Sequence, residues 1–183
     1  KLEKNNCMLI VDESFLDFTA DKKSISLEQE IEKYPNMAIL KSMSKAYGIC
    51  GLRIGYLLTA NSEFASSVRN EIHIWNINGF AEEFLRILPN YQQEFEDSCK
   101  TVIKDRDIFY NQLCAIPEMK VFKPDANYIF CRLPDDALSG PEVTKRLFIE
   151  YNIYIKDSKG KTQPEADRYI RIASRTQEEN SKL

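Results

Sequence analysis

The chain has 183 residues, of which 43% are hydrophobic and 29% are charged, a composition typical of a folded globular protein. Its formal net charge of -3 gives no broad basic surface, so the sequence offers no support for binding nucleic acid or an anionic membrane. No apolar run approaches the roughly 18 residues that a membrane-spanning helix needs.

The cysteines indicate a reducing compartment. There are five of them, an odd number, and no two form a C-x-x-C pair. Scattered thiols of this kind are typical of a cytoplasmic protein and do not predict a disulfide framework or a zinc site. With a single histidine, His73, the sequence predicts no metal site.

Three short apolar segments in the first sixty residues predict strands of an α/β sheet. Residues 7–11 end in Asp12 and Glu13, the pattern of a buried parallel strand with acids at its carboxyl end. A second strand, 37–40, leads into the turn 42–45, and a third covers 53–59. A short polar helix is expected at 27–33. Ligand chemistry gathers at the ends of such strands.

The rest of the chain predicts helices and then a second, α+β lobe. Helices are expected at 62–70, 79–88 and 91–115. In the last of these, apolar residues recur at helical spacing and form one stripe, interrupted by Arg106. The second lobe combines a helix at 141–151 with strands at 119–122, 127–133, 153–156 and 169–174.

The residues around Lys45 carry the strongest chemical pattern. Ser42 and Ser44 precede this lysine, and Gly51, Arg53 and Gly55 follow it. An amine can form an imine with an aldehyde, hydroxyl and guanidinium groups can hold a phosphate, and glycines allow close backbone approach. The Ser-x-Ser-Lys motif alone is weak, because most such lysines are solvated surface residues.

Three separated motifs together resemble one family. Residues 12–18, 42–56 and 171–180 are similar to fold-type I, pyridoxal-phosphate-dependent aminotransferases of class I/II, closest to the histidinol-phosphate aminotransferase and threonine-phosphate decarboxylase branch. The resemblance covers about the second half of such an enzyme. It implies the end of a large, mostly parallel α/β domain in 1–90, and a connecting helix with a small α+β domain in 91–183. We expect the chain to be a fragment.

The resemblance assigns roles to the residues of the first domain. Lys45 would form the imine with pyridoxal 5'-phosphate and later shuttle the substrate Cα proton. Asp12 would pair with the pyridine nitrogen, so that the ring stays an electron sink. Ser42, Ser44 and Arg53 would hold the phosphate. The alternative for Asp12 is a helix N-cap after a strand.

Phe15 departs from the commonest family pattern. Many members have a tyrosine here, which donates to the phenolic oxygen of the cofactor. Losing that donor removes a hydrogen bond of roughly 1.5–3 kcal/mol. The resemblance associates phenylalanine with the decarboxylase branch, and we expect Phe15 to raise the proton affinity of the imine.

Four residues near the end are candidates for substrate binding. Arg171 matches the family arginine that grips the substrate carboxylate. Arg175 lies roughly 13 Å further along a strand, so it binds a second anion or forms a surface ion pair. Lys156 is either a second anion-binding group or a solvated lysine. Asn127 recurs in the family near the carboxylate.

The resemblance implies an aminotransferase acting on a small amino acid, with a keto acid as co-substrate and a homodimer as the assembly. One alternative is the decarboxylation of a phosphorylated amino acid. The other is a non-catalytic module of the same fold, fused to another enzyme. In family members, the N-terminal half of the chain supplies the aromatic residue that stacks on the cofactor ring and some of the groups that bind the cofactor phosphate. We therefore expect this fragment to bind the cofactor weakly when isolated.

Overall fold

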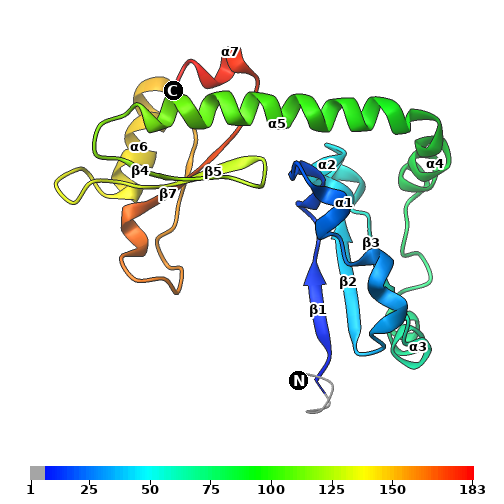
Figure 1. The fold of residues 1–183 in the computed structure, drawn as a ribbon. Coiled ribbons are helices and arrows are strands. Elements are labelled where there is room, and N and C mark those ends of the chain that lie inside the picture. Colours follow the sequence, from blue (N-terminus) through cyan, green and yellow to red (C-terminus); the bar gives the residue numbers. More distant parts are fainter. Residues whose placement is uncertain (1–6) are drawn as a thin grey trace. The chain divides into compact units, whose positions relative to one another are not determined.

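The chain divides into two compact units, Lys1–Cys99 and Lys100–Leu183. A computed structural model describes residues 7–183 (Figure 1). The longest helix, α5 (Gln92–Cys114), contains the boundary and contributes residues to both units. Its predicted stripe is confirmed, because Cys99, Arg106, Phe109 and Leu113 are all buried.

Unit 1 contains a three-stranded sheet in the order β1-β2-β3. Strand β1 (Leu9–Asp12) pairs in parallel with β2 (Met37–Ser42), which pairs antiparallel with β3 (Gly55–Thr59). The three strands were predicted, but the prediction that β1 is buried is wrong. Ile10 is 59% exposed, because it lies on the sheet face that also leaves Leu40 of the central strand β2 exposed.

Short helices connect and cover these strands. After β1 come the 3-10 turn η2 (Leu16–Phe18), α1 (Lys22–Ile25) and η3 (Glu28–Lys33), which occupies the predicted helix 27–33. After β2 come α2 (Met43–Ala46) and η4 (Cys50–Leu52), and after β3 come α3 (Ser62–Glu71), α4 (Gly79–Ile87) and η5 (Leu88–Tyr91). Asn61 and Asn78 cap α3 and α4 by accepting from backbone N–H groups.

Unit 2 contains an antiparallel sheet in the order β4-β5-β7-β6. Its strands are β4 (Lys120–Phe122), β5 (Tyr128–Arg132), β6 (Lys156–Asp157) and β7 (Tyr169–Ala173), accompanied by α6 (Gly140–Tyr151), η6 (Ala166–Arg168) and α7 (Gln177–Asn180). Strand β6 starts later than the predicted strand 153–156. The N–H of Ile153 is instead used at the end of α6, where it donates to the Leu147 carbonyl at 3.1 Å.

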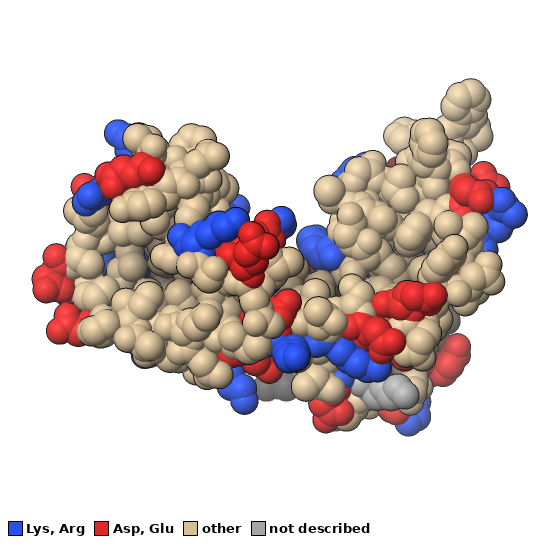
Figure 2. Space-filling model, turned by 90° about the horizontal axis from the view of Figure 1, so that it is seen from above, with Lys and Arg blue, Asp and Glu red and all other residues tan. Residues whose placement is uncertain are grey.

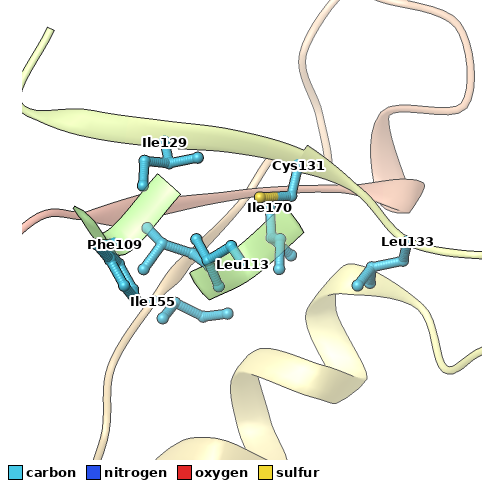
Figure 3. Close-up of a cluster of buried hydrophobic side chains, with 8 residues drawn as sticks. Phe109, Leu113, Ile129, Cys131, Leu133, Ile155 and Ile170 are labelled. Atoms are coloured by element: carbon cyan, nitrogen blue, oxygen red, sulfur yellow. The ribbon is translucent and has the colours of Figure 1, made fainter. Parts of the chain in front are cut away.

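One apolar cluster forms the core of unit 2. Phe109 and Leu113 from α5 meet Ile129 and Cys131 from β5 and Ile170 from β7, and Figure 3 shows these side chains pointing toward one another. The buried residues of β5 alternate with half-buried ones, and those of β7 alternate with half-buried or exposed ones, as expected for a sheet with one face on the core. The other face of this sheet is therefore free to present polar side chains.

The surface carries interspersed charges of both signs, and neither sign dominates the face in Figure 2. Several of these charges form local pairs along helices, such as Arg146 with Glu150 at 3.0 Å. Within residues 7–183, every helix is too short or too polar to cross a membrane.

Candidate active site

The end of β1 presents a carboxylate that is held ionised. Asp12 is the last residue of the strand, and the Ser14 N–H donates to its Oδ1 at 2.9 Å. Hydrogen bonds from the Ser14 hydroxyl and N–H lower the pKa of Asp12, partial burial opposes this shift, and the charge of Lys45 adds to it. The Asp12 carboxylate thus remains charged at neutral pH and lies within electrostatic reach of the Lys45 amine.

Lys45 lies on α2, directly after β2. Ser42 caps this short helix by accepting from the Ser44 N–H at 3.4 Å. The Lys45 side chain is exposed, and its Nζ lies 5.4 Å from the centroid of the Phe15 ring. The fold therefore brings together Asp12, Phe15 and Lys45, three residues from two separate motifs.

Backbone pairing explains this proximity. Asp12 lies opposite Leu40 in the parallel ladder, and the N–H of Glu13 donates to the Leu40 carbonyl at 2.9 Å. One step further along, the Ser42 N–H donates to the Ser14 Oγ at 2.8 Å. Sequence analysis missed Ser14. The only signal was a small hydroxyl residue two positions after the acid.

The turn before β3 carries the candidate phosphate-binding arginine. Gly55 lies opposite Ser42 in the antiparallel ladder, and a Cβ at Gly55 would come within 2.6 Å of the Lys41 carbonyl oxygen. Arg53, two residues earlier, adopts the left-handed conformation with φ 55°. Its Nη1 donates to the Cys50 carbonyl at 3.2 Å, and the side chain is exposed. A left-handed non-glycine residue is strained by about 1 kcal/mol or more, which is common at functional turns.

A buried ionic cluster underlies the two cofactor-binding motifs. The Asp17 side chain on η2 is only 2% exposed, and the Lys41 Nζ on β2 lies 3.2 Å from its Oδ2. Lys22 on α1 binds the other carboxylate oxygen of Asp17. This cluster joins the segment after Asp12 to the strand before Lys45. Sequence analysis missed this cluster. The available signal was that Lys41 lies two residues after Ile39 on β2, so both side chains point to the same, buried face of the strand.

In unit 2, two candidate substrate-binding cations lie side by side. Lys156 on β6 is the register partner of Arg171 on β7, so both side chains project from the same face of the sheet. Both are exposed. The guanidinium carbon of Arg171 lies 4.8 Å from the centroid of the Tyr128 ring, a cation–π contact that restricts the arginine. Two like charges directly opposite repel each other, so this arrangement favours an anion between them.

The other two candidates of unit 2 have different surroundings. Asn127 is half-buried just before β5, and its carbonyl accepts from the Ser174 N–H at 3.0 Å. Arg175 pairs through its Nη2 with Glu179 at 3.0 Å, and its backbone is bonded by the Asn180 side chain. This contact is the surface ion pair that was the alternative to substrate binding.

The donor set fits pyridoxal phosphate. An amine, an ionised carboxylate and an aromatic ring gather at the ends of β1 and β2, with hydroxyls and a guanidinium on the adjoining turns. Among the described residues, no group of three or more His, Cys, Asp or Glu side chains is arranged to hold a metal ion.

Comparison with known proteins agrees with this chemistry. Residues 1–183 match the family described as aminotransferase class I and II. The chain is 41% identical over 173 residues to a CMP-5'-(3-aminopropyl)phosphonate synthase from Streptomyces rubellomurinus, covering 94% of this chain and 27% of the relative. It is 35% identical to an L-serine phosphate decarboxylase from Campylobacter jejuni, covering 94% of this chain and 45% of the relative.

A solved structure shows the same fold. The histidinol-phosphate aminotransferase from Clostridium acetobutylicum superposes with a TM-score of 0.90 at 31% identity, covering 99% of this chain and 53% of that one. The fold is therefore that of the second half of a fold-type I pyridoxal-phosphate enzyme. The chain spans less than half the length of the two curated relatives.

Proposed function

Because the chain belongs to the class I and II aminotransferase family, which uses pyridoxal phosphate, we propose that its parent protein transforms a small amino acid bearing a second anionic group. The observation that carries the cofactor assignment is the convergence of Asp12, Phe15 and Lys45 at the ends of β1 and β2, where the Lys45 Nζ lies 5.4 Å from the centroid of the Phe15 ring. The observation that carries the substrate class is the register pairing of Lys156 with Arg171.

The bound cofactor supplies an aldehyde that condenses with amines and an electron-poor ring that stabilises negative charge at the substrate Cα. Lys45 would hold the cofactor through its Nζ, and the same nitrogen would accept or deliver the proton at the substrate Cα. Asp12 would accept a hydrogen bond from the ring nitrogen and would keep that nitrogen cationic. Ser42, Ser44 and Arg53 bind the phosphate, whose oxygens suit hydroxyl and guanidinium donors.

On the substrate, Arg171 binds the carboxylate and Lys156 binds the second anion. Asn127 adds a neutral donor near the carboxylate. The Tyr128 ring holds the Arg171 guanidinium in place, and a dianionic substrate offsets the repulsion between the two cations. Arg175 is already engaged by Glu179, so we assign it no substrate contact.

Two reactions use these residues. In transamination Lys45 would remove the Cα proton, and in decarboxylation the carboxylate would leave as carbon dioxide and Lys45 would deliver a proton to Cα. The outcome would depend on which bond to the substrate Cα breaks. Phe15 and the similarity to a serine phosphate decarboxylase favour decarboxylation, whereas the similarity to a histidinol-phosphate aminotransferase favours transamination.

An assay of the full-length protein separates the two reactions. Loaded enzyme is mixed with O-phospho-L-serine or L-serine, with and without a keto-acid acceptor, and both carbon dioxide and keto acid are measured. We expect at least a tenfold preference for the phosphorylated substrate. Removing Lys45 (Lys45→Ala) should lower the rate at least a thousandfold, since the attachment and proton-transfer group is lost. Equal rates on both substrates would contradict the substrate class.

A non-catalytic module is the remaining alternative, and the presence of Lys45, Asp12 and Arg171 in the sequence argues against it. If the loaded full-length protein forms no product from either substrate, the non-catalytic alternative is supported and the enzyme assignment is wrong. We further propose that the parent works as a homodimer in the cytoplasm. The buried thiols Cys99 and Cys131, which form no disulfide, fit a reducing compartment.

A further inference from the structure

The side-chain amide of Asn78 makes two hydrogen bonds to different parts of unit 1. Its Oδ1 accepts from the Ala81 N–H at 3.0 Å, which caps α4. Its Nδ2 donates to the Leu52 carbonyl at 2.9 Å. A helix cap needs only the oxygen, so the bond to Leu52 is additional. It connects the start of α4 to the turn that carries Arg53.

The Leu52 carbonyl belongs to the peptide group that joins Leu52 to Arg53. Because a peptide group is planar, the direction of this carbonyl is linked to the φ angle of Arg53. Arg53 has φ 55°, a left-handed conformation that a non-glycine residue keeps only where its surroundings hold it. By fixing the direction of the carbonyl, the hydrogen bond from Asn78 stabilises this conformation.

Apolar packing joins the same elements. Ala81, in the first turn of α4, is completely buried in a cluster with Met43 of α2 and with Ile54, the residue after Arg53. The Met43 N–H also donates to the Ile54 carbonyl at 3.2 Å. Helix α4 therefore packs against both segments that carry cofactor-binding candidates, and Asn78 fixes its first residues to the Arg53 turn.

We propose that Asn78 is a positioning residue, which holds the Arg53 turn in the conformation that directs the guanidinium toward the cofactor phosphate. This inference rests on the proposed function, in which Arg53 binds that phosphate. A guanidinium has five N–H donors, so the bond from Nη1 to the Cys50 carbonyl leaves others for a phosphate. A donor that is already in place increases affinity, because less conformational entropy is lost on binding.

The phosphate itself supplies a test that separates positioning from stability. The full-length protein is titrated with pyridoxal 5'-phosphate and with pyridoxal, which lacks the phosphate, and dissociation constants are measured by absorbance. Asn78→Ser keeps an oxygen that can cap α4 but lacks the amide that reaches Leu52. We expect this variant to bind pyridoxal 5'-phosphate about fivefold more weakly, as for loss of one hydrogen bond, and pyridoxal with less than a twofold change.

A double-mutant cycle tests whether Asn78 acts through Arg53. Arg53→Gln removes the guanidinium and should weaken pyridoxal 5'-phosphate binding by about tenfold or more. Adding Asn78→Ser to Arg53→Gln should change the dissociation constant less than twofold, because the group that Asn78 positions is absent. The matched control is Asn61→Ser. Asn61 caps α3 by accepting from the Phe64 N–H at 2.8 Å, and its replacement should leave both affinities unchanged.

A second variant of Asn78 keeps the test decisive if the serine variant is unstable. Asn78→Asp retains the shape and the cap but places a carboxylate oxygen opposite the Leu52 carbonyl, so it should also weaken pyridoxal 5'-phosphate binding. Titration at high salt screens its added charge. The thermal midpoint of each cofactor-free variant checks that it is folded.

The outcomes are distinct. The positioning role is overturned, and the proposed function left intact, if Asn78→Ser does not change pyridoxal 5'-phosphate affinity or weakens pyridoxal equally. A loss that persists in the Arg53→Gln background overturns it as well. If Arg53→Gln itself binds pyridoxal 5'-phosphate as tightly as the unaltered protein, the assignment of Arg53 to the phosphate is wrong, and the role of Asn78 with it.

Discussion

The two units bury their apolar side chains differently. In unit 2, eight buried residues form one continuous cluster between α5, α6 and the sheet. In unit 1, the buried apolar side chains form two smaller clusters, around Ile39 and around Met43. The sheet of unit 1 also exposes apolar side chains, with Ile10 at 59% and Leu40 at 42%.

The less covered face of unit 1 is the one that carries the chemistry. Because side chains alternate along a strand, Ile10 shares a face with Asp12, and Leu40 shares a face with Ser42. The opposite face contains Ile39 and the buried Lys41. Unit 2, in contrast, presents Arg171 and Lys156 on the outer face of a sheet whose inner face is fully packed. The cofactor residues therefore depend more on polar contacts for their positions than the substrate residues do.

The largest stability effect is expected at the ionic cluster of unit 1. Replacing Asp17 with asparagine (Asp17→Asn) leaves the ammonium group of Lys41 buried without its carboxylate and should lower the free energy of unfolding by about 3–5 kcal/mol. Denaturant unfolding of the full-length protein measures this change. The exposed pair Lys33–Glu30 supplies the control, Glu30→Gln, which should have no measurable effect. A tolerated Asp17→Asn would mean that apolar packing alone holds unit 1.

The core of unit 2 gives the next largest effect. Ile129 is completely buried, so Ile129→Ala should cost about 2–5 kcal/mol of unfolding free energy in the isolated chain. Leu40→Ala, a comparable truncation on the exposed face of unit 1, should cost less than about 0.5 kcal/mol there. Chemical denaturation of the two variants compares the units directly. Equal losses of unfolding free energy in the two variants would show that the sheet face carrying Leu40 is as well packed as the core of unit 2.

The smallest effect is expected on the pH titration of the bound cofactor. Phe15→Tyr adds a hydroxyl beside Lys45, whose Nζ lies 5.4 Å from the ring centroid, and this hydroxyl can donate to the phenolic oxygen of the cofactor. A donor to that oxygen stabilises the deprotonated form, so the pH midpoint of the cofactor's absorbance titration should fall by about one unit. The corresponding change in unit 2, Phe122→Tyr, should leave the midpoint unchanged. An unaltered midpoint in Phe15→Tyr would rule out this role for Phe15.

The local spacing of apolar residues in the sequence predicted most of the helices and strands. The apolar segments before Asp12 and before Ser42 indicated strands, and the period of the stripe from Cys99 to Leu113 indicated α5, because both patterns depend on residues close in sequence. The prediction failed for the burial of β1 and for the start of β6. Burial depends on which neighbours a strand acquires, and the N–H of Ile153 is taken by α6.

The sequence by itself determined the chemical groups: a lysine framed by serines, an acid at a strand end and an arginine in an alternating strand. Only the tertiary structure decided which of them meet. The parallel register of β1 and β2 brings Asp12 toward Lys45, the antiparallel register of β6 and β7 places Lys156 opposite Arg171, and Glu179 engages Arg175. Register is set by hydrogen bonds between strands distant in sequence, and a shift of one residue would turn each side chain to the other face.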